Sequence, residues 1–261
     1  MATSRIAMAT VGAAALIALA GCTPLTQSRL DFSNTEEVKI TQITVARGGS
    51  GDVVVITGQV SNVQIDRVVR YHGGEPRTTG NYRINGTELL LDADCGQRCS
   101  VSYEIIAPEG VSVRGETGSG EVSLTRVGTV DIKVGSGGIT VNGASGTVKA
   151  ETGSGEVSIS DVKSAVTART GSGGITGRGL GDGQVDVETG SGSVSLTLST
   201  AGSVRAHTAS GEVELAVPPG SYRVSVNTGT GDKNVGVSND PTATLHLDVK
   251  TGSGDVTISQ R

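Results

Sequence analysis

A four-residue phrase, T-G-S-G, recurs with small departures from residue 117 to the end of this 261-residue chain. The residue after the Thr position is Gly in seven copies and Ala in one, and it advances by 17, 18, 18, 19, 19, 20 and 23 residues from copy to copy. A near-fixed period of this size indicates a stacked-repeat protein, in which each unit packs only on its neighbours. The recurring positions are Gly118, Gly135, Gly153, Gly171, Gly190, Ala209, Gly229 and Gly252.

Apolar residues hold fixed places on both sides of this turn. They alternate with polar residues at a period of two, which predicts a strand, a Gly-rich turn and a second strand in each unit. The first apolar position always precedes the last by 11 residues, as from Val113 to Leu124, so only the connection to the next unit varies in length. We therefore predict an all-β fold, in which residues 111–261 form a parallel single-chain β-solenoid of about eight regular rungs.

The residue before the Thr position mostly alternates in charge from one unit to the next. Parallel in-register stacking would put equivalent residues about 4.8 Å apart, where opposite charges attract and like charges repel. A generic solvated face does not predict this alternation, so the column predicts a charge ladder across stacked rungs. The column of residues after the second Gly of the turn does not fit this pattern, because Glu212, Asp232 and Asp255 would place acids side by side. The ladder column is Glu116, Lys133, Glu151, Arg169, Glu188, His207, Asn227 and Lys250.

The first 21 residues have the layout of a secretory signal. Arg5 precedes a small apolar run over residues 6–20, which is short for a membrane span. The run ends in Leu-Ala-Gly-Cys22, which resembles the bacterial lipobox, whose Cys becomes the lipidated first residue of the mature protein. We predict a lipoprotein signal peptide over residues 1–21 and a lipid on Cys22 that anchors the protein to the extracytoplasmic face of a bacterial membrane. An ordinary signal peptide with a chance Cys is the alternative.

Two further segments separate Cys22 from the repeats. Residues 22–37, which begin with the lipidated Cys, are polar and contain Pro24, and we predict that they form a tether. Residues 38–110 contain several β-forming runs and three of the five aromatic residues, which predicts an N-terminal β-rich cap region. Within the cap region, residues 48–55 read GGSGDVVV and point to an early, degraded rung, although the residues before them are out of register.

Cys95 and Cys99 form an even pair once Cys22 is assigned to lipid. An extracytoplasmic location permits a disulfide, and the short loop between the two residues allows one. The alternatives are a metal or a redox site, but neither a second ligand cluster nor a thioredoxin-like C-x-x-C spacing is present. We therefore predict a local disulfide between Cys95 and Cys99.

The Gly-Ser-Gly turns could also carry chemistry. Phosphate binding would call for a following helix and a Lys, and calcium-binding repeats would call for an Asp in nearly every turn. The column of Thr residues in the turns suggests an ice or mineral binder, but hydrogen bonds within the turns explain it better. No catalytic triad, metal-ligand spacing or cofactor fingerprint is present, and His72, His207 and His246 are scattered. We expect no catalysis, no metal and no cofactor.

An enzyme acting on envelope polysaccharide is the main alternative, with Glu156 of the turn as acid or base. Such enzymes commonly use paired carboxylates, which aromatic or basic subsites would accompany. Here most acids stand opposite bases, and Tyr222 is the only aromatic residue within the repeats. The net charge of −5 argues against nucleic acid as a partner.

Residues 101–124 read VSYEIIAPEGVSVRGETGSGEVSL, and TGSGEV and GSGGIT units follow them. Together with the lipobox, this pattern resembles the bacterial putative-adhesin family of β-strand-repeat proteins of unknown function. The resemblance covers about residues 38–261 and implies a β-solenoid in the cell envelope, with no catalytic residues to transfer. We expect a binding or structural module, held to the membrane by the lipid on Cys22, with an envelope glycan or a protein as its ligand.

The last unit is preceded by a long insertion, residues 236–246. An uncovered terminal strand would offer its backbone donors and acceptors to another chain, and solenoids ordinarily need polar caps at their ends. We therefore expect this insertion to fold over the edge of the last rung, and the protein to be a monomer.

Overall fold

The computed structural model of the chain describes residues 27–261, which contain 23 β-strands and no helix. Eight regular rungs each consist of a first strand, a Gly-rich turn and a second strand. In sequence order they are β8 (Ser112–Ser119) with β9 (Val122–Thr125), β10 (Val130–Ser136) with β11 (Ile139–Asn142), β12 (Val148–Ser154) with β13 (Val157–Ser160), β14 (Val166–Ser172) with β15 (Ile175–Leu180), β16 (Val185–Ser191) with β17 (Val194–Leu198), β18 (Val204–Ser210) with β19 (Val213–Val217), β20 (Tyr222–Thr230) with β21 (Lys233–Val235), and β22 (Leu245–Ser253) with β23 (Val256–Gln260).

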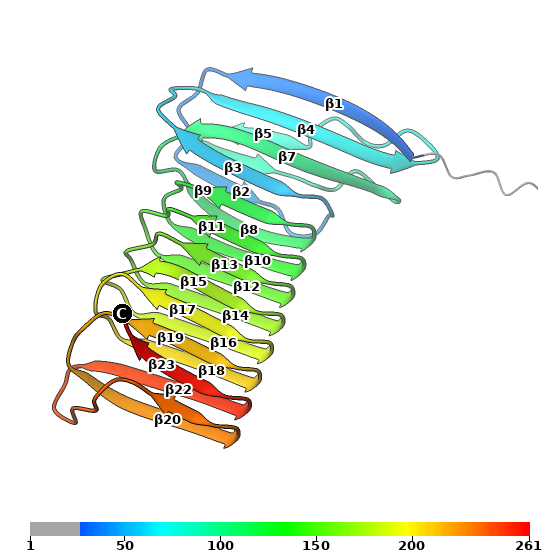
Figure 1. Cartoon of the computed structure of the whole chain (residues 1–261). Coiled ribbons are helices and arrows are strands. Elements are labelled where there is room, and N and C mark those ends of the chain that lie inside the picture. The colour runs from blue at the N-terminus through cyan, green and yellow to red at the C-terminus, as the bar shows by residue number, and fades with distance from the viewer. Residues whose placement is uncertain (1–26) are drawn as a thin grey trace, which may run out of the picture.

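The first strands of the rungs stack in one sheet and the second strands in another (Figure 1). Neighbouring strands are parallel and in the register that the sequence columns predict, for example Val130 opposite both Val113 and Val148. The apolar columns point between the two sheets and are almost fully buried, as in Val130, Val148 and Ile139. Each such side chain stabilises the fold by about 1.5–3 kcal/mol. The predicted all-β parallel solenoid is confirmed.

A ninth rung precedes the regular ones. Strand β2 (Gln42–Val45) pairs with β8, and β3 (Val53–Gly58) pairs with β9, both in parallel. Ile43 lies opposite Val113, whereas Ser50 lies opposite Ser119, so this rung carries one extra residue between the two points. The extra residue explains why the segment before the turn is out of register with the other repeats in the sequence.

The remaining strands form the cap. Strand β7 (Cys99–Pro108) is parallel to β3, and β4 (Val63–His72) and β1 (Gln27–Glu36) extend that sheet in antiparallel fashion. On the opposite sheet, β6 (Glu88–Leu91) is parallel to β2, and β5 (Tyr82–Asn85) is antiparallel to β6. One sheet thus has 12 strands and the other has 11.

The prediction of a tether over residues 22–37 is wrong from Gln27 onward. All ten residues of β1 pair with β4, from Gln27 opposite His72 to Glu36 opposite Val63. The polar composition of the segment hides an alternating pattern, in which Leu30 and Phe32 pack against the core while their neighbours face solvent. Cys22 and the predicted signal peptide lie outside the described residues.

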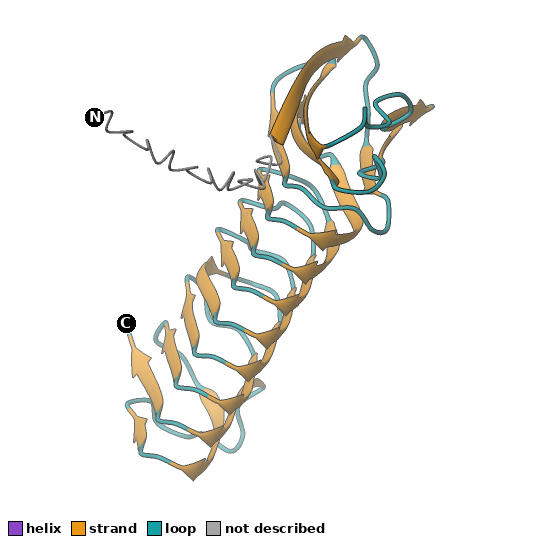
Figure 2. Cartoon of the chain, turned by 90° about the vertical axis from the view of Figure 1, so that its right-hand side faces the viewer, coloured by secondary structure: helices purple, strands orange, loops and turns teal. Residues whose placement is uncertain are grey.

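The order of the last two rungs is not the order of the sequence. Strand β22 pairs with β18 on one side and with β20 on the other, and β23 lies in the same way between β19 and β21. The C-terminal strand is therefore inside the array, and β20 lies at its tip (Figures 1 and 2). Our expectation that the last unit in the sequence is the last rung in space is wrong.

Side-chain composition explains this exchange. Leu247 and Val249 of β22 and Ile258 of β23 are almost fully buried, as a position between two rungs allows. The rung of β20 and β21 is poorer in apolar residues, and Val235 at its end is 40% exposed. Placing the more apolar rung inside buries more apolar surface, and the long connection before β22 gives the chain enough length to turn back.

The insertion covers the start of the new edge strand. The amide of Asp240 donates to the carbonyl of Tyr222 at 2.8 Å, and the side chain of Asn239 accepts from the amide of Val224 at 2.9 Å. Asp240 also accepts hydrogen bonds from the hydroxyls of Ser221 and Thr242, which lower the pKa of its carboxyl to about 2. The insertion thus lies over the end of the array as expected, although the rung it covers is that of β20.

Candidate functional site

A groove of about 870 Å³ runs across the regular rungs on the outer face of the 11-stranded sheet. Strand residues alternate between the core and solvent, so one outward position in every rung falls on the first Gly of the turn. That column of glycines forms a floor without side chains, and the charge ladder forms one wall. The lining includes Lys133, Glu151, Arg169, Glu188, His207 and Lys250 from the ladder, with Gly153, Gly171, Gly190, Ala209 and Gly252 from the floor.

Close packing of the turns explains the bare floor. A Cβ on Gly153 would lie 2.5 Å from the carbonyl oxygen of Gly135 in the preceding rung. Two residues later, Gly155 has a φ of +147°, and a Cβ there would lie 2.1 Å from the oxygen of Gly137. The first of these slots accepts a methyl group once, at Ala209, which is the one floor position with a side chain in the described rungs.

The Thr column stabilises the turns. The hydroxyl of Thr152 donates to the carbonyl of Gly137 at 2.9 Å, and that of Thr170 donates to Gly155 at 3.0 Å. Thr251 reaches Gly211 in the same way, at 2.9 Å. These three side chains are 5–6% exposed. The prediction of turn hydrogen bonds is confirmed, and an ice or mineral surface would find the hydroxyls covered.

Arg169 is the centre of the charge ladder. Its guanidinium lies 3.6 Å from both Asp186 and Glu188 of the next rung and 3.9 Å from Glu151 of the preceding rung. Lys149 similarly lies 3.6 Å from Asp131 and 3.4 Å from Glu151. The ion pairs therefore connect two parallel columns diagonally as well as along each column.

Lys133 behaves differently from Arg169. It lies in register between Glu116 and Glu151, as the sequence predicts, but within residues 27–261 its amino group forms no ion pair. Glu116 pairs instead with Arg47 at 3.1 Å, and Glu151 pairs with Lys149 and Arg169. One wall of the groove thus holds a cation whose neighbouring acids already have partners.

The exchanged rung completes the ladder at its far end. Asp248 of β22 lies opposite Arg205 of β18, and its carboxylate is 3.1 Å from the imidazole of His207. Lys250 lies 3.5 Å from the same carboxylate. In the order of the sequence, Ser225 and Asn227 would have stood beside Arg205 and His207, so the exchange improves the match of charges.

The carboxylates weighed for catalysis lie on the other sheet. Glu156 and Glu121 are exposed around a shallow hollow that Gly138, Thr140 and Ser158 also line, with neither a base nor an aromatic ring among the lining residues. Glu212 and Asp255 share another hollow with Glu214. Neither hollow contains a basic residue, in contrast to the groove.

The histidines and the other candidate metal ligands are dispersed. His72 ends β4 in the cap, His207 lies in the ladder, and His246 lies in β22, where its amide donates to the hydroxyl of Ser203. Between residues 27 and 261, no group of three His, Cys, Asp or Glu side chains is placed to hold a metal ion.

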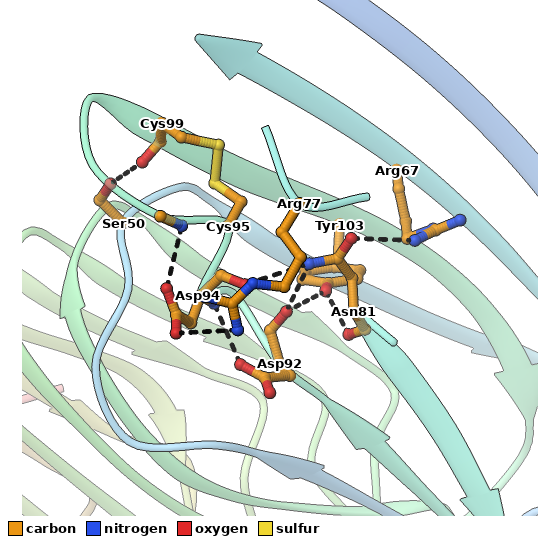
Figure 3. Close-up of a disulfide and its surroundings, with 10 residues drawn as sticks. Ser50, Arg67, Arg77, Asn81, Asp92, Asp94, Cys95, Cys99 and Tyr103 are labelled. Carbon is orange, nitrogen blue, oxygen red and sulfur yellow. Dashed lines mark hydrogen bonds and ion pairs between the residues drawn. A yellow bond between two sulfur atoms is a disulfide. The ribbon is translucent and has the colours of Figure 1, made fainter. Parts of the chain in front are cut away.

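The disulfide predicted from the sequence is present. Cys95 and Cys99 are bonded, with their Cα atoms 5.8 Å apart, and the bond joins the loop before β7 to the first residue of that strand (Figure 3). Behind this loop the hydroxyl of Tyr103 lies 2.6 Å from the carbonyl oxygen of Asn81 and 2.7 Å from that of Asp92, and burial raises the pKa of the hydroxyl. Arg67, 7% exposed, stacks on the rings of Phe32 and Tyr82. These contacts stabilise the cap.

Sequence reasoning found the ladder and missed the groove. The signal was present, because an outward Gly in every rung leaves a bare column beside the charged one. We assigned those glycines only to turns. No helix in the described part of the chain has the length and apolar character of a membrane span.

Comparisons with known proteins identify the family of this chain. The profile of the Toastrack DUF4097 family matches residues 31–261. Among solved structures, a putative cell adhesion protein from Clostridium sporogenes ATCC 15579 is 14% identical over 90% of this chain and 100% of its own, with a TM-score of 0.28. A putative adhesin from Bacteroides fragilis NCTC 9343 is 11% identical over 90% of this chain and 98% of its own, with a TM-score of 0.34. No curated protein matches. Since the family profile spans almost all of the described strands, the chain belongs to the Toastrack DUF4097 family.

Proposed function

We propose that this protein is a lipid-anchored, non-catalytic binding module of the bacterial cell envelope, and that its groove binds a glycan strand of that envelope. The observation that carries the proposal is the groove itself, which repeats the same floor and wall in successive rungs about 4.8 Å apart. A long, open groove with a periodic lining suits an extended polymer better than a compact small molecule.

The chemistry of the lining residues limits which polymers the groove could bind. The wall offers carboxylates and cations in alternation, and the floor is backbone with one methyl group, that of Ala209. No aromatic residue lines the groove, so the ligand would be held by polar and charged contacts to its hydroxyl, amide and carboxylate groups. Peptidoglycan carries all three groups and is the envelope glycan to test first.

A steric variant in the groove tests this proposal. Ala209→Tyr places a ring on the floor without changing any charge, and we expect it to weaken co-sedimentation of the protein with purified peptidoglycan sacculi. Ala216→Tyr is the matched control, because Ala216 faces outward from β19, in the other sheet of the same rung. If the wild-type protein does not sediment with sacculi, or if both variants bind equally well, the groove is not a site for this glycan.

The anchor is proposed from the sequence around Cys22. The described fold begins at Gln27, so that a lipid on Cys22 would hold the cap end of the solenoid close to the bilayer. Cys22→Ser should abolish metabolic labelling of the protein with palmitate and release it from the membrane fraction. Unchanged labelling of the variant would show that a different residue carries the lipid.

The absence of catalysis is part of the proposal and has its own test. The names of the two solved structures refer to adhesion, and we propose an adhesion-like binding role for this chain as well. We also propose that the protein is a monomer and that it has no nucleic-acid partner. Incubation with purified envelope glycans should release no soluble fragments. Cleavage that disappears in Glu156→Gln would establish the enzyme in place of the binding module.

A further inference from the structure

A cluster of basic residues lies on the cap, at the end where β1 begins. Arg70 and His72 are alternate residues near the end of β4 and so share one face, and Arg98 lies in the disulfide loop beside them. Together with Gln27, Ser50 and Ser100 they line a hollow of about 370 Å³. We call these three basic residues the cap cluster.

The fold positions the cap cluster firmly. The backbone amide of His72 donates to the carbonyl of Arg98 at 3.1 Å, which ties the loop to the end of β4. The disulfide between Cys95 and Cys99 closes the loop that contains Arg98. Arg70 lies opposite Ser100 of β7, so β-sheet pairing places it beside the same loop.

The charges of the two arginines in the cap cluster are not neutralised by ion pairs among residues 27–261. No acidic residue lines the hollow, and within residues 27–261 none of the three side chains forms an ion pair with a carboxylate. The nearby acids have partners of their own, since Asp31 pairs with Arg29 and Asp94 pairs with Arg77. The hydrogen bond from Arg29 holds the pKa of the Asp31 carboxyl below its usual value, and the charges of Arg29 and Arg70 lower it further.

Gln27 places this surface close in sequence to Cys22, the residue proposed to carry the lipid. It pairs with His72 and lines the hollow, and it is five residues from Cys22. Five residues span at most about 18 Å when fully extended. A lipid on Cys22 would therefore hold the cap cluster within reach of the headgroups around that lipid.

We propose that the cap cluster binds the anionic headgroups of the membrane that carries the protein. The negative surface potential of an anionic bilayer strengthens association by a factor of about five for each basic residue at the surface. Bound in this way, the cap end would rest on the bilayer while the groove projects away from it. The role in the cell depends on the anchor proposed above, whereas the affinity for headgroups does not.

Chemical lipidation of the purified protein tests the affinity of the cap cluster for headgroups separately from lipidation in cells. The chain from Cys22 onward contains every described strand, and Cys22 is the only free thiol, because the other two of its three cysteines form the disulfide. A single acyl chain, coupled to Cys22 through a maleimide, binds a membrane weakly and reversibly. Any further attraction between the cap cluster and the headgroups then increases the measured membrane binding. We expect stronger partitioning onto vesicles that contain phosphatidylglycerol than onto vesicles of phosphatidylcholine alone.

Matched variants then test the residues. Arg70→Gln and Arg98→Gln should each lower partitioning onto the phosphatidylglycerol vesicles by about five-fold. Arg178→Gln makes the same change of charge at an exposed site in the middle of the solenoid and should have little effect. Circular dichroism checks that each variant is folded.

Two outcomes would overturn the proposal. One is equal partitioning onto both kinds of vesicle, and the other is an equal loss in Arg178→Gln and in the cap variants. Neither result depends on whether cells lipidate Cys22, so it would leave the anchoring proposal standing. Conversely, loss of the anchor in cells would leave the vesicle result unchanged.

Discussion

At the scale of single residues, the turns show which glycines the fold requires and which it merely prefers. The first Gly of the turn faces outward and is once replaced, at Ala209, whereas the second is Gly in every regular rung and has a positive φ throughout. The sequence could predict the need for positive φ but not the difference between the two slots. That difference depends on how closely the backbone of each turn lies on that of the preceding rung.

Gly155→Ala should therefore destabilise the protein by about 2 kcal/mol or more, since it combines an unfavourable φ with a clash against the oxygen of Gly137. Gly153→Ala is the matched control two residues away, in the slot that Ala209 fills in another rung. Its Cβ would also crowd a carbonyl oxygen, that of Gly135, but its φ is not positive, so we expect a clearly smaller loss. Urea unfolding of the two variants measures both effects. Equal losses would mean that φ and the tight turn contact do not distinguish the slots.

At the scale of elements, the regular strands could be predicted because each has an apolar alternation and a Gly-rich turn. Strand β1 was missed because its alternation involves only Leu30 and Phe32 in a polar segment, and its pairing with β4 is a contact distant in sequence. The charge ladder was predicted in its columns but not in its ion pairs. The reach of the side chains makes those pairs diagonal, so that Arg169 pairs with three acids, while Lys133 pairs with none among residues 27–261.

Reversal of charge tests whether the ladder couples neighbouring rungs. Lys133→Glu would add a third carboxylate between Glu116 and Glu151. Glu151→Lys in the same chain should offset part of that repulsion, but it also removes the ion pairs of Glu151 with Lys149 and Arg169, so the single Glu151→Lys variant is needed to subtract this separate loss. Exposed cross-strand pairs contribute about 0.2–1 kcal/mol each, so a coupling of that size is expected. A double-mutant cycle by urea unfolding gives the coupling energy. A value indistinguishable from zero would argue against electrostatic contact between these rungs.

At the scale of the whole molecule, the sequence predicts a stack but not its order. The apolar columns of the repeats align equally well in any order of the rungs. They therefore cannot reveal that β22 and β23 fold back between earlier strands. The deciding terms are the burial of Leu247 and Val249, the pairing of Asp248 with His207 and the length of the connection. The charge of the groove depends on this order, because Lys250 rather than Asn227 continues its wall next to His207.

Engineered disulfides test this order most directly, in a Cys22→Ser background. Adjacent strands bring paired Cα atoms to about 4.5–5.5 Å, within the range that a disulfide spans, whereas strands one rung further apart are separated by about 10 Å, which exceeds it. Ser253 lies opposite both Ser210 and Thr230. We predict that Ser210→Cys with Ser253→Cys cross-links on mild oxidation, as does Thr230→Cys with Ser253→Cys, while Ser210→Cys with Thr230→Cys does not. Cross-linking between positions 210 and 230, without cross-linking between 210 and 253, would show that the rungs stack in sequence order and would contradict the account of the groove.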